Sequence, residues 1–496
     1  MKKTVQNFIG GEWTASATGE TFESINPADT SEVVAAVSKS SRTDVDNAVN
    51  AARGAYRMWR LTPAPKRGEI LYKAGEILTK RKRELGELLT REMGKVLAEA
   101  LGDVQEAIDM AYYMAGEGRR LSGETIPSEL PDKDCKSGRV PIGVCGLITP
   151  WNFPVAIPAW KLMPALVSGN TVVFKPSSHT PACAAMLVEI LREAGLPAGV
   201  LNLINGSGEE TGDYLASHYG IDGISFTGST AVGLGIAKTC AERGKRVSCE
   251  MGGKNAIIIM EDADLSLALE GAVWGGFGTS GQRCTSSSRL VVHRAVHDKF
   301  LDMFAAAAGR LRLGSGLKPE TDVGPVINKA QMEKVLKYIG TGKEEGAKLV
   351  TGGNACREGG CEKGYFIEPT IFSGVTPEMR IAQEEIFGPV VSVLRAEDLD
   401  DAIGIVNGTA YGLVSSIYTR DVNKSAVAER ELDTGIVYIN SSTIGAEIQL
   451  PFGGTKRSGF GHEEAGGRGG SLDMFTKWKV VYRDFSGRLQ KAQIDR

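Results

Sequence analysis

Long hydrophobic runs are missing from this 496-residue sequence: no stretch approaches the roughly 18 uninterrupted apolar residues that a membrane-spanning helix needs. An excess of charge of one sign is missing too, since 57 lysines and arginines face 60 aspartates and glutamates and the formal net charge is −3. So weak a field predicts neither nucleic acid nor membrane as a partner. Behind the two lysines near the N-terminus there is no apolar run, so we expect no signal peptide.

Closely spaced cysteines and histidine clusters are also absent. The eight cysteines include no CxxC pair, and the five histidines do not cluster with them, so the spacing rules for zinc ligands predict no metal site. Scattered cysteines in a chain of this length, without an export signal, are typical of reduced thiols, and we therefore expect a cytoplasmic protein. Most of these cysteines should lie in the core. The question is whether one of them has a chemical role.

What the sequence does contain is an alternation of short β-branched runs with helical segments. A hairpin is expected around Gly10-Gly11, and residues 43–118 are predicted to be mostly helical. Short buried strands are then predicted at 142–149, 171–175, 200–204, 224–227, 246–250 and 256–260. Helices are predicted at 181–194, 208–217, 229–243 and 264–278. This alternation is typical of an α/β fold with a doubly wound parallel sheet.

A second alternating unit follows the first. Its strands are predicted near 288–293, 347–351, 390–395, 414–418 and 436–439. Its helices are predicted near 295–311, 329–344, 399–407 and 422–432. We interpret it as a second α/β domain. The strand-like segment Trp478–Tyr482 near the C-terminus has no obvious partner in that domain, so we expect it to pair between domains or between subunits.

Three motifs carry groups that chemistry could use. In the motif 226–233 a buried strand leads through Gly228 to Ser229 at a helix start, where backbone N–H groups can bind an anion such as a pyrophosphate. Glu250 follows a strand and precedes two glycines, but by itself such a residue could be a solvated surface carboxylate. Cys284 lies among small polar residues after a glycine-rich helix, where a thiol can be activated by N–H dipoles, although a single cysteine is more often a core residue.

The order of the motifs is more specific than any one of them. The set is TPWNFP at 149–154, KPS at 175–177, FTGSxxxG at 226–233, EMGGK at 250–254, GQRC at 281–284, EIFGP at 385–389 and PFGGxKxSG at 451–459. This set resembles the aldehyde dehydrogenase superfamily, and the match runs from about residue 8 to about residue 482. The separation of Glu250 and Cys284, 284 − 250 = 34 residues, is the one that the family shows.

The resemblance implies a reaction and its residues. Cys284 is the expected nucleophile for an aldehyde carbonyl, and the amide of Asn152 with the backbone N–H of Cys284 is expected to hold the oxyanion. Hydride then leaves for a nicotinamide, and Glu250 acts as the general base that activates water to hydrolyse the thioester, giving a carboxylic acid. Lys161 and Glu463 match positions proposed to relay the proton outward.

The same resemblance implies a site for NAD+ or NADP+ on a Rossmann-like sheet. Ser229 and its helix start, after Gly228, are expected at the pyrophosphate, Lys175 at the adenosine ribose, and Glu385 at the nicotinamide ribose with Phe387 nearby. The groove is expected to be lined also by Ile148, Trp151, Gly208 and Gly212. NAD-preferring members often have a glutamate where this chain has Ser178. We therefore predict that NADP+ is accepted, and leave open whether it is preferred.

The family fold implies three parts: a Rossmann-like cofactor domain, an α/β catalytic domain and a small β oligomerisation arm. The predicted boundaries are 1–120 and 141–252 for the cofactor domain, 253–450 for the catalytic domain, and 121–140 and 451–496 for the arm and tail. Edge-to-edge pairing of the arm predicts a homodimer or a homotetramer. For residues 484–496 two hypotheses stand side by side: they wrap a neighbouring subunit, or they are disordered.

The substrate is the most open question. The stretch 445–466, with GQRC and Ser178, is similar to members that act on semialdehydes such as 2-oxoglutarate or succinate semialdehyde, and Arg283 is a candidate partner for the substrate carboxylate. Broad specificity for aliphatic or aromatic aldehydes is an open alternative. A cysteine esterase would need a histidine signature that the sequence lacks, and a non-catalytic structural role is disfavoured by the intact Cys284, Glu250 and Asn152.

Overall fold

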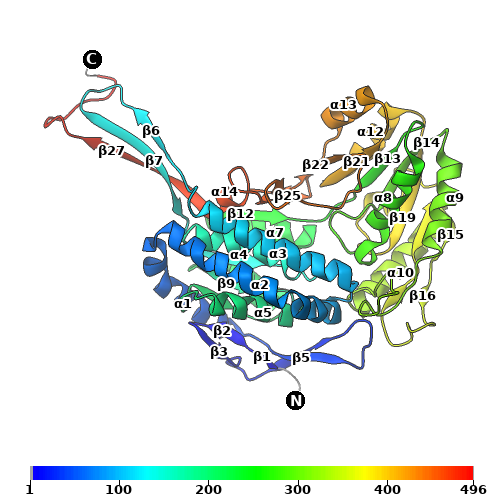
Figure 1. Ribbon diagram of the computed structural model, residues 1–496, viewed down its shortest axis with the longest axis horizontal. Helices are drawn as coiled ribbons and strands as arrows, with labels where there is room; N and C mark the ends of the chain where they lie inside the picture. Colours follow the sequence, from blue (N-terminus) through cyan, green and yellow to red (C-terminus); the bar gives the residue numbers. More distant parts are fainter. Residues whose placement is uncertain (1–3, 495–496) are drawn as a thin grey trace.

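Three long helices form the N-terminal helical region. The computed structural model, which describes residues 4–494, places α1 at Arg42–Leu61, α2 at Ala64–Met93 and α3 at Leu97–Glu117. The first begins at a capping box between Ser41 and Asp44, and the second ends where Gly94 adopts the left-handed conformation, as helix ends commonly do. α2 and α3 pack on each other and on helices of the first large sheet (Figure 1).

The first large sheet has eight strands in the order β25-β12-β11-β8-β9-β10-β2-β3. Its five parallel strands are β8 (Val144–Ile148), β9 (Thr171–Lys175), β10 (Leu201–Leu203), β11 (Gly223–Thr227) and β12 (Arg246–Glu250). The antiparallel edges are β2 (Asn7–Ile9) and β3 (Glu12–Thr14), which form the predicted hairpin, and β25 (Gly459–Phe460). The chain order reverses between β8 and β11, and ligands of such sheets bind beyond the carboxyl ends of the strands at this point.

Helices cover both faces of this sheet, which confirms the doubly wound α/β prediction. They are α4 (Ala156–Val167), α5 (Pro181–Glu193), α6 (Asp213–Ser217) after a π-helical turn at Gly208–Gly212, and α7 (Thr230–Glu242). The central strands are wholly buried, because parallel strands covered by helices bury both faces.

The second large sheet has seven strands in the order β15-β18-β19-β14-β13-β21-β22. The strands are β13 (Ala256–Ile259), β14 (Arg289–His293), β15 (Lys348–Thr351), β18 (Thr370–Ser373), β19 (Val390–Ala396), β21 (Val414–Tyr418) and β22 (Ile436–Ile439). The helices are α8 (Leu265–Phe277), α9 (His297–Ala308), α10 (Lys329–Glu344), α11 (Arg380–Gln383), α12 (Leu399–Asn407) and α13 (Val422–Glu431). The pairs are parallel except β15 with β18.

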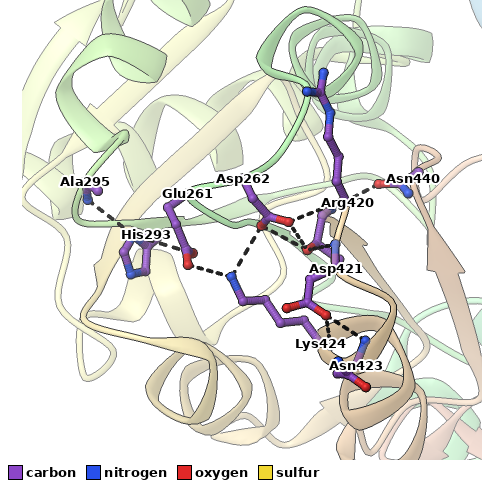
Figure 2. A network of polar contacts seen from close by, with 10 residues as sticks. Glu261, Asp262, His293, Ala295, Arg420, Asp421, Asn423, Lys424 and Asn440 are labelled. Atoms are coloured by element: carbon purple, nitrogen blue, oxygen red, sulfur yellow. Dashed lines mark hydrogen bonds and ion pairs between the residues drawn. The ribbon is translucent and has the colours of Figure 1, made fainter.

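The reversal point of the second sheet, between β13 and β21, is held together by its own charged side chains (Figure 2). Asp262, which follows β13, accepts hydrogen bonds from the Thr419 hydroxyl at 2.9 Å and from the Arg420 backbone N–H at 2.8 Å. Lys424 donates to Glu261 at 2.5 Å and to Asp262 at 3.4 Å. These carboxylates and cations are one another's partners. The network therefore joins the strand ends of the second sheet at its reversal point, whereas the first sheet presents functional groups at the corresponding point.

A three-stranded arm projects from the body (Figure 1). It consists of β6 (Glu124–Pro127), β7 (Lys133–Pro141) and β27 (Thr476–Asp484), with β7 in the middle. The segment Trp478–Tyr482, for which the sequence offered no obvious partner, lies in β27. This strand pairs with β7 of the same chain. The predicted arm extended too far toward the N-terminal side of β27. Residues 451–475 instead supply β25 to the first sheet and α14 (Ser471–Phe475), which packs on α4.

The tail after the arm folds back onto it. The backbone N–H of Phe485 donates to the Asp132 carbonyl at 3.0 Å, and the Gln490 side chain donates to the Pro131 carbonyl at 2.7 Å. These contacts place Phe485 and Gln490 against the arm of their own subunit; residues 495–496 lie outside the described residues.

Smaller sheets complete the structure. They are β1 (Thr4–Val5), β4 (Thr21–Ile25) and β5 (Val33–Ser38); β16 (Ala355–Cys356) with β17 (Phe366–Ile367); β20 (Tyr411–Gly412) with β24 (Thr455–Lys456); and β23 (Pro451–Phe452) with β26 (Glu464–Ala465). Across residues 4–494, no helix combines the length and the apolar character needed to traverse a lipid bilayer.

Candidate active site

The loop that carries Cys284 has an unusual backbone. It follows a short 3-10 turn (Gly278–Gly281) in which Thr279 and Ser280 have φ of 51° and 57° and Gly281 has φ of 68°. A side chain at Gly281 would place its Cβ 2.2 Å from the Gly388 carbonyl oxygen, so only glycine fits there. Such backbone strain is maintained only where surrounding contacts enforce it, and it gathers at functional sites.

Hydrogen bonds hold the main chain on both sides of Cys284. The Asn255 side-chain amide donates to the Cys284 carbonyl at 2.6 Å and to the Ser286 carbonyl at 3.0 Å. The Asn152 side-chain amide, which is 3% exposed, donates to the Gln282 carbonyl at 3.0 Å. Asn152 follows β8 and Asn255 precedes β13, so elements of both large sheets fix the position of the cysteine.

Cys284 lies where two cavities meet. The larger, of about 380 Å³, contains Glu250 and has mainly apolar walls formed by Phe153, Ile157, Trp160, Met251, Trp274 and Phe452. The smaller, of about 180 Å³, is lined by Trp151, Asn152, Ser229, Glu385 and Phe387. One sulfur is thus open to two spaces of different chemistry, unlike that of a core cysteine.

The sulfur is a protonated thiol in the resting site. Burial, and then the charges of Glu385, Glu250 and Glu464, raise the pKa of Cys284 to about 12. Thiolate is the reactive form. Formation of the thiolate therefore requires a base or a cation beside the sulfur.

Glu250 ends β12 and is only 4% exposed, which excludes the interpretation as a solvated surface carboxylate. Its Oε2 is buried without a hydrogen-bond partner in the described chain. Burial, and then the charge of Glu464, raise the pKa of Glu250 well above its usual value, while Lys161 opposes them. An unpartnered carboxyl of raised pKa beside a nucleophile is a typical arrangement for acid–base catalysis.

The prediction that Glu463 accompanies Lys161 is wrong by one residue. Lys161, buried on α4, donates to the Ser225 hydroxyl at 2.8 Å and forms an ion pair with Glu464, whose carboxylate also accepts a hydrogen bond from the Thr227 hydroxyl at 2.5 Å. Glu463 is exposed. β26 begins at Glu464, which pairs with Phe452 of β23, and this strand pairing holds Glu464 rather than Glu463 against Lys161.

The expected dinucleotide groove begins at the ends of β8 and β9, where Ile148 and Lys175 are register partners. Lys175 is buried, donates to the Pro176 carbonyl at 2.8 Å, and burial lowers its pKa to about 8. The Lys175 stem passes beside Gly212, where an added Cβ would lie 3.5 Å from Cδ. Gly208 begins the π-helical turn that Gly212 ends, and the half-buried Ser178 lies in the turn after β9. The structure thus brings this part of the predicted set together.

Gly228 and Ser229 connect β11 to α7. The backbone N–H of Gly228 donates to the Glu250 carbonyl at 3.0 Å, and a Cβ at Gly228 would lie 2.5 Å from the Phe226 ring. Ser229 is the residue before the first turn of α7 and lines the smaller cavity. The free N–H groups and the positive end of the helix dipole therefore adjoin this cavity, as an anion site requires.

Glu385 and Phe387 form the opposite wall of the smaller cavity. Glu385 accepts a hydrogen bond from the Gly253 N–H at 3.0 Å, and a Cβ at Gly252 would come within 2.4 Å of its Oε2. The glycine pair is thus needed for the close approach of this carboxyl. Phe387, with φ of 60°, meets Trp151 edge to face with ring centroids 5.4 Å apart.

Arg283, the predicted candidate partner for a substrate carboxylate, lines the larger cavity and brings a basic group to it. Its guanidinium donates to Glu99 at 3.0 Å and to the Thr279 hydroxyl at 2.9 Å, and it lies 5.2 Å from the Phe153 ring centroid.

Three acidic residues of α3 that were not predicted from the sequence also line the larger cavity: Glu99, Asp103 and Glu106. Their spacing of four and three residues places them on one helix face, which is the one sequence signal that could have identified them.

The family model of the aldehyde dehydrogenase family matches residues 13–481 of this chain. The chain is 42% identical to the alpha-ketoglutaric semialdehyde dehydrogenase of Bacillus subtilis over 97% of its length and 98% of that protein's. It is 44% identical to the alpha-ketoglutarate semialdehyde dehydrogenase of Haloferax volcanii, over 98% and 100%.

Among solved structures, the chain is similar to the betaine aldehyde dehydrogenase of Staphylococcus aureus in complex with NAD+. The TM-score is 0.95, at 35% identity, covering 98% of this chain and 95% of that one. A match of this extent to family, relatives and structure shows that the chain belongs to the aldehyde dehydrogenase family and oxidises aldehydes with a nicotinamide cofactor.

Proposed function

We propose that the chain oxidises a semialdehyde that carries a carboxylate. The first candidate substrate is 2-oxoglutarate semialdehyde, and the second is succinate semialdehyde. The product is the carboxylic acid, formed through a thioester on Cys284. The position of Cys284 between an apolar cavity and a dinucleotide-type cavity carries this proposal.

The acylation step uses the groups around the sulfur. The thiol of Cys284 loses its proton to water, the resulting thiolate attacks the aldehyde carbon, and the Asn152 amide with the Cys284 backbone N–H holds the oxyanion. Loss of one such donor costs about 2.7–4 kcal/mol of transition-state stabilisation. When the oxyanion collapses to a carbonyl, hydride leaves the carbon and the thioester remains; the bound nicotinamide supplies the acceptor for this hydride.

The deacylation step assigns Glu250 its role. Its unpartnered carboxylate takes a proton from water, the hydroxide adds to the thioester carbon, and the sulfur leaves as the acid is released. The buried ion pair of Lys161 with Glu464 adjoins Glu250 and offers its proton a path outward. Because water can be activated here, we favour hydrolysis over transfer to another acyl acceptor.

The dinucleotide is assigned to the smaller cavity and its groove. The start of α7 at Ser229 is placed at the pyrophosphate, Lys175 at the adenosine ribose, and Glu385 with Phe387 at the nicotinamide ribose. Gly228 and Gly252 line this cavity at positions where a side chain would collide with the Phe226 ring and the Glu385 carboxyl, respectively.

NADP+ is expected to be accepted because Ser178, near Lys175, supplies a neutral hydroxyl where a carboxylate would repel a 2′-phosphate. The test compares kcat/KM for NAD+ and NADP+ in the wild type and in Ser178→Glu. We expect the substitution to lower kcat/KM for NADP+ by about tenfold or more, since like charges at close range disfavour binding. A wild type that prefers NAD+ at least tenfold would contradict the expectation.

The carboxylate preference depends on Arg283. Its guanidinium has five N–H donors, of which one is given to Glu99 and one to Thr279, so further donors remain for a ligand of the cavity that Arg283 lines. The two semialdehyde dehydrogenases reported above support this choice. The betaine aldehyde dehydrogenase shares the fold with a different named substrate, so the cavity side chains must decide.

The experiment follows dinucleotide reduction at 340 nm with 2-oxoglutarate semialdehyde, succinate semialdehyde and pentanal. We expect Arg283→Met to lower kcat/KM for the two semialdehydes by about tenfold or more, because a charge-assisted hydrogen bond is lost, and to leave pentanal oxidation nearly unchanged. Arg294→Met, on the surface, is the matched control. Equal rates of the wild type with pentanal and both semialdehydes would favour the broad-specificity alternative, and a signal that survives Cys284→Ala would refute the assigned nucleophile.

The homodimer or homotetramer and the cytoplasmic location belong to the proposal as well. Support for assembly comes from the arm, where Trp478, Val480 and Tyr482 alternate along β27 and remain more than half exposed. Support for a reducing compartment comes from the eight cysteines, all of which are free thiols.

A further inference from the structure

One carboxyl in the larger cavity has no partner. Glu106, on α3, lines this cavity and is half-buried, yet no hydrogen bond or ion pair within residues 4–494 reaches its side chain. The two other acids of the same helix face differ from it. Glu99 is bound by Arg283, and Asp103 is bound by Lys95 at 3.1 Å and by the Ala156 N–H at 2.7 Å.

The surroundings of Glu106 favour its neutral form. Burial, and then the charge of Asp103, raise the pKa of Glu106 to about 8, with Asp109 acting in the same direction and Lys95 and Arg283 against it. From the second sheet, Tyr438 is the titratable group on which the charge of Glu106 acts, together with the charge of Glu447. A protonated carboxyl has one O–H donor and spare acceptor oxygens.

We propose that Glu106 is a specificity-determining residue, whose carboxylic acid donates a hydrogen bond to an oxygen near the carboxylate end of the substrate while Arg283 binds the carboxylate. This inference rests on the proposed function. It assigns to Glu106 the recognition of the 2-oxo oxygen, which a 2-oxo semialdehyde has and a plain semialdehyde lacks. The walls around Glu106 are mainly apolar, so an unsatisfied polar group there gains its partner when the substrate enters.

The alternative ligand for an acidic cavity residue is an ammonium group, as in an aminoaldehyde. Two observations disfavour it. The charges of Glu99 and Asp103 are already balanced by Arg283 and Lys95. A neutral Glu106 adds no negative charge to attract a cation, whereas its O–H suits a carbonyl or carboxylate oxygen.

The test compares the wild type with Glu106→Leu and Glu106→Gln on three aldehydes of five carbons: 2-oxoglutarate semialdehyde, glutarate semialdehyde, which lacks the 2-oxo oxygen, and pentanal. We expect Glu106→Leu to lower kcat/KM for the 2-oxo substrate by about tenfold or more and to change that for pentanal little, because the donor is lost while the apolar cavity is kept. Glu106→Gln keeps a donor and should retain activity within about threefold. Glu76→Gln, which removes an exposed charge from the neighbouring helix α2, is the matched control and should match the wild type.

A pH profile gives a second readout. For the wild type, kcat/KM with the 2-oxo substrate, divided by that with pentanal, should fall as the pH rises through about 8, because the ionised Glu106 cannot donate and repels the substrate. In Glu106→Gln the ratio should stay flat.

The outcomes separate the two proposals. Equal loss on all three aldehydes in Glu106→Leu, or no loss on the 2-oxo substrate, would overturn the role of Glu106, as would a wild-type preference for 4-aminobutanal. A wild type that oxidises pentanal but neither semialdehyde would refute the proposed substrate itself, and with it this inference.

Discussion

The chemistry of Cys284 depends on a proton that the resting site does not release readily, because burial and nearby carboxylates raise the pKa of the thiol to about 12. A bound dinucleotide would change this balance, because the positive charge of an oxidised nicotinamide ring would favour the thiolate. Deacylation has no such help and needs a base. At the scale of residues, Cys284 and Glu250 should therefore be separable by kinetics.

Glu250→Gln should accumulate the thioester. We expect one turnover of reduced dinucleotide in a rapid burst and a steady-state rate lower by about 100-fold or more, because the amide cannot accept a proton from water. Stopped-flow absorbance at 340 nm measures both phases. Loss of the burst together with the steady state would contradict the assignment of Glu250 to deacylation.

The same residue predicts the direction of a pH effect. The base form of Glu250 is the deprotonated one, and its pKa is raised well above the ordinary 4.5, so deacylation should slow on acidification starting well above pH 4.5. The residual rate of Glu250→Gln should lack this dependence. Single-turnover acylation with the wild type serves as the reference.

The residues at the site show how far a sequence can go. Cys284, Glu250 and Asn152 were predicted, and the structure places all three around one cavity junction. The error at Glu463 arose because two adjacent glutamates are equivalent in a motif, and only the pairing of β26 decides which of them faces Lys161. Glu106 was missed because a half-buried acid on an amphipathic helix looks like a solvated one.

At the scale of elements, the strands with buried β-branched runs were predicted closely. The predicted ranges of β9 and β12 agree with the structure, because period and composition are local properties. β18 and the two-residue strands β23 to β26 were missed, since so short a strand is defined by its partner rather than by its own sequence.

The loop after β12 leads to a prediction at this scale. Gly252→Ala would place a Cβ 2.4 Å from the Glu385 carboxyl and force that side chain away from the cavity. We expect the KM for the dinucleotide to rise by about tenfold or more with little change in thermal stability. Gly235→Ala, on α7 with open space around it, is the control and should leave the KM unchanged. Equal dinucleotide KM in both variants would show that Glu385 does not contact the cofactor.

At the scale of the whole molecule, the arm is the part least buried in its own subunit. Trp478, Val480 and Tyr482 lie two residues apart on the edge strand β27 and are therefore on one face. A free edge with an apolar face is what strand pairing between copies requires. The assembly could not be predicted more finely from the sequence, because its geometry depends on how two such edges meet.

Val480→Lys should weaken that assembly. We expect the mass measured by light scattering after size exclusion to shift toward the 52.8 kDa of one chain, because a charge would be buried at the contact. Val422→Lys, at a 75% exposed valine outside the arm, controls for the substitution itself. An unchanged mass for Val480→Lys would place the contact elsewhere.

The amide of Asn255 has one more consequence. Its hydrogen bond to the Cys284 carbonyl fixes the backbone of the nucleophile, so the sulfur can move only by rotation about the Cα–Cβ bond, among three staggered rotamers. A ligand in one of the two cavities beside Cys284 therefore restricts the rotamers that direct the sulfur toward the other cavity. The two ligands need not touch to affect each other: the order in which they arrive should determine how quickly carbon and sulfur join.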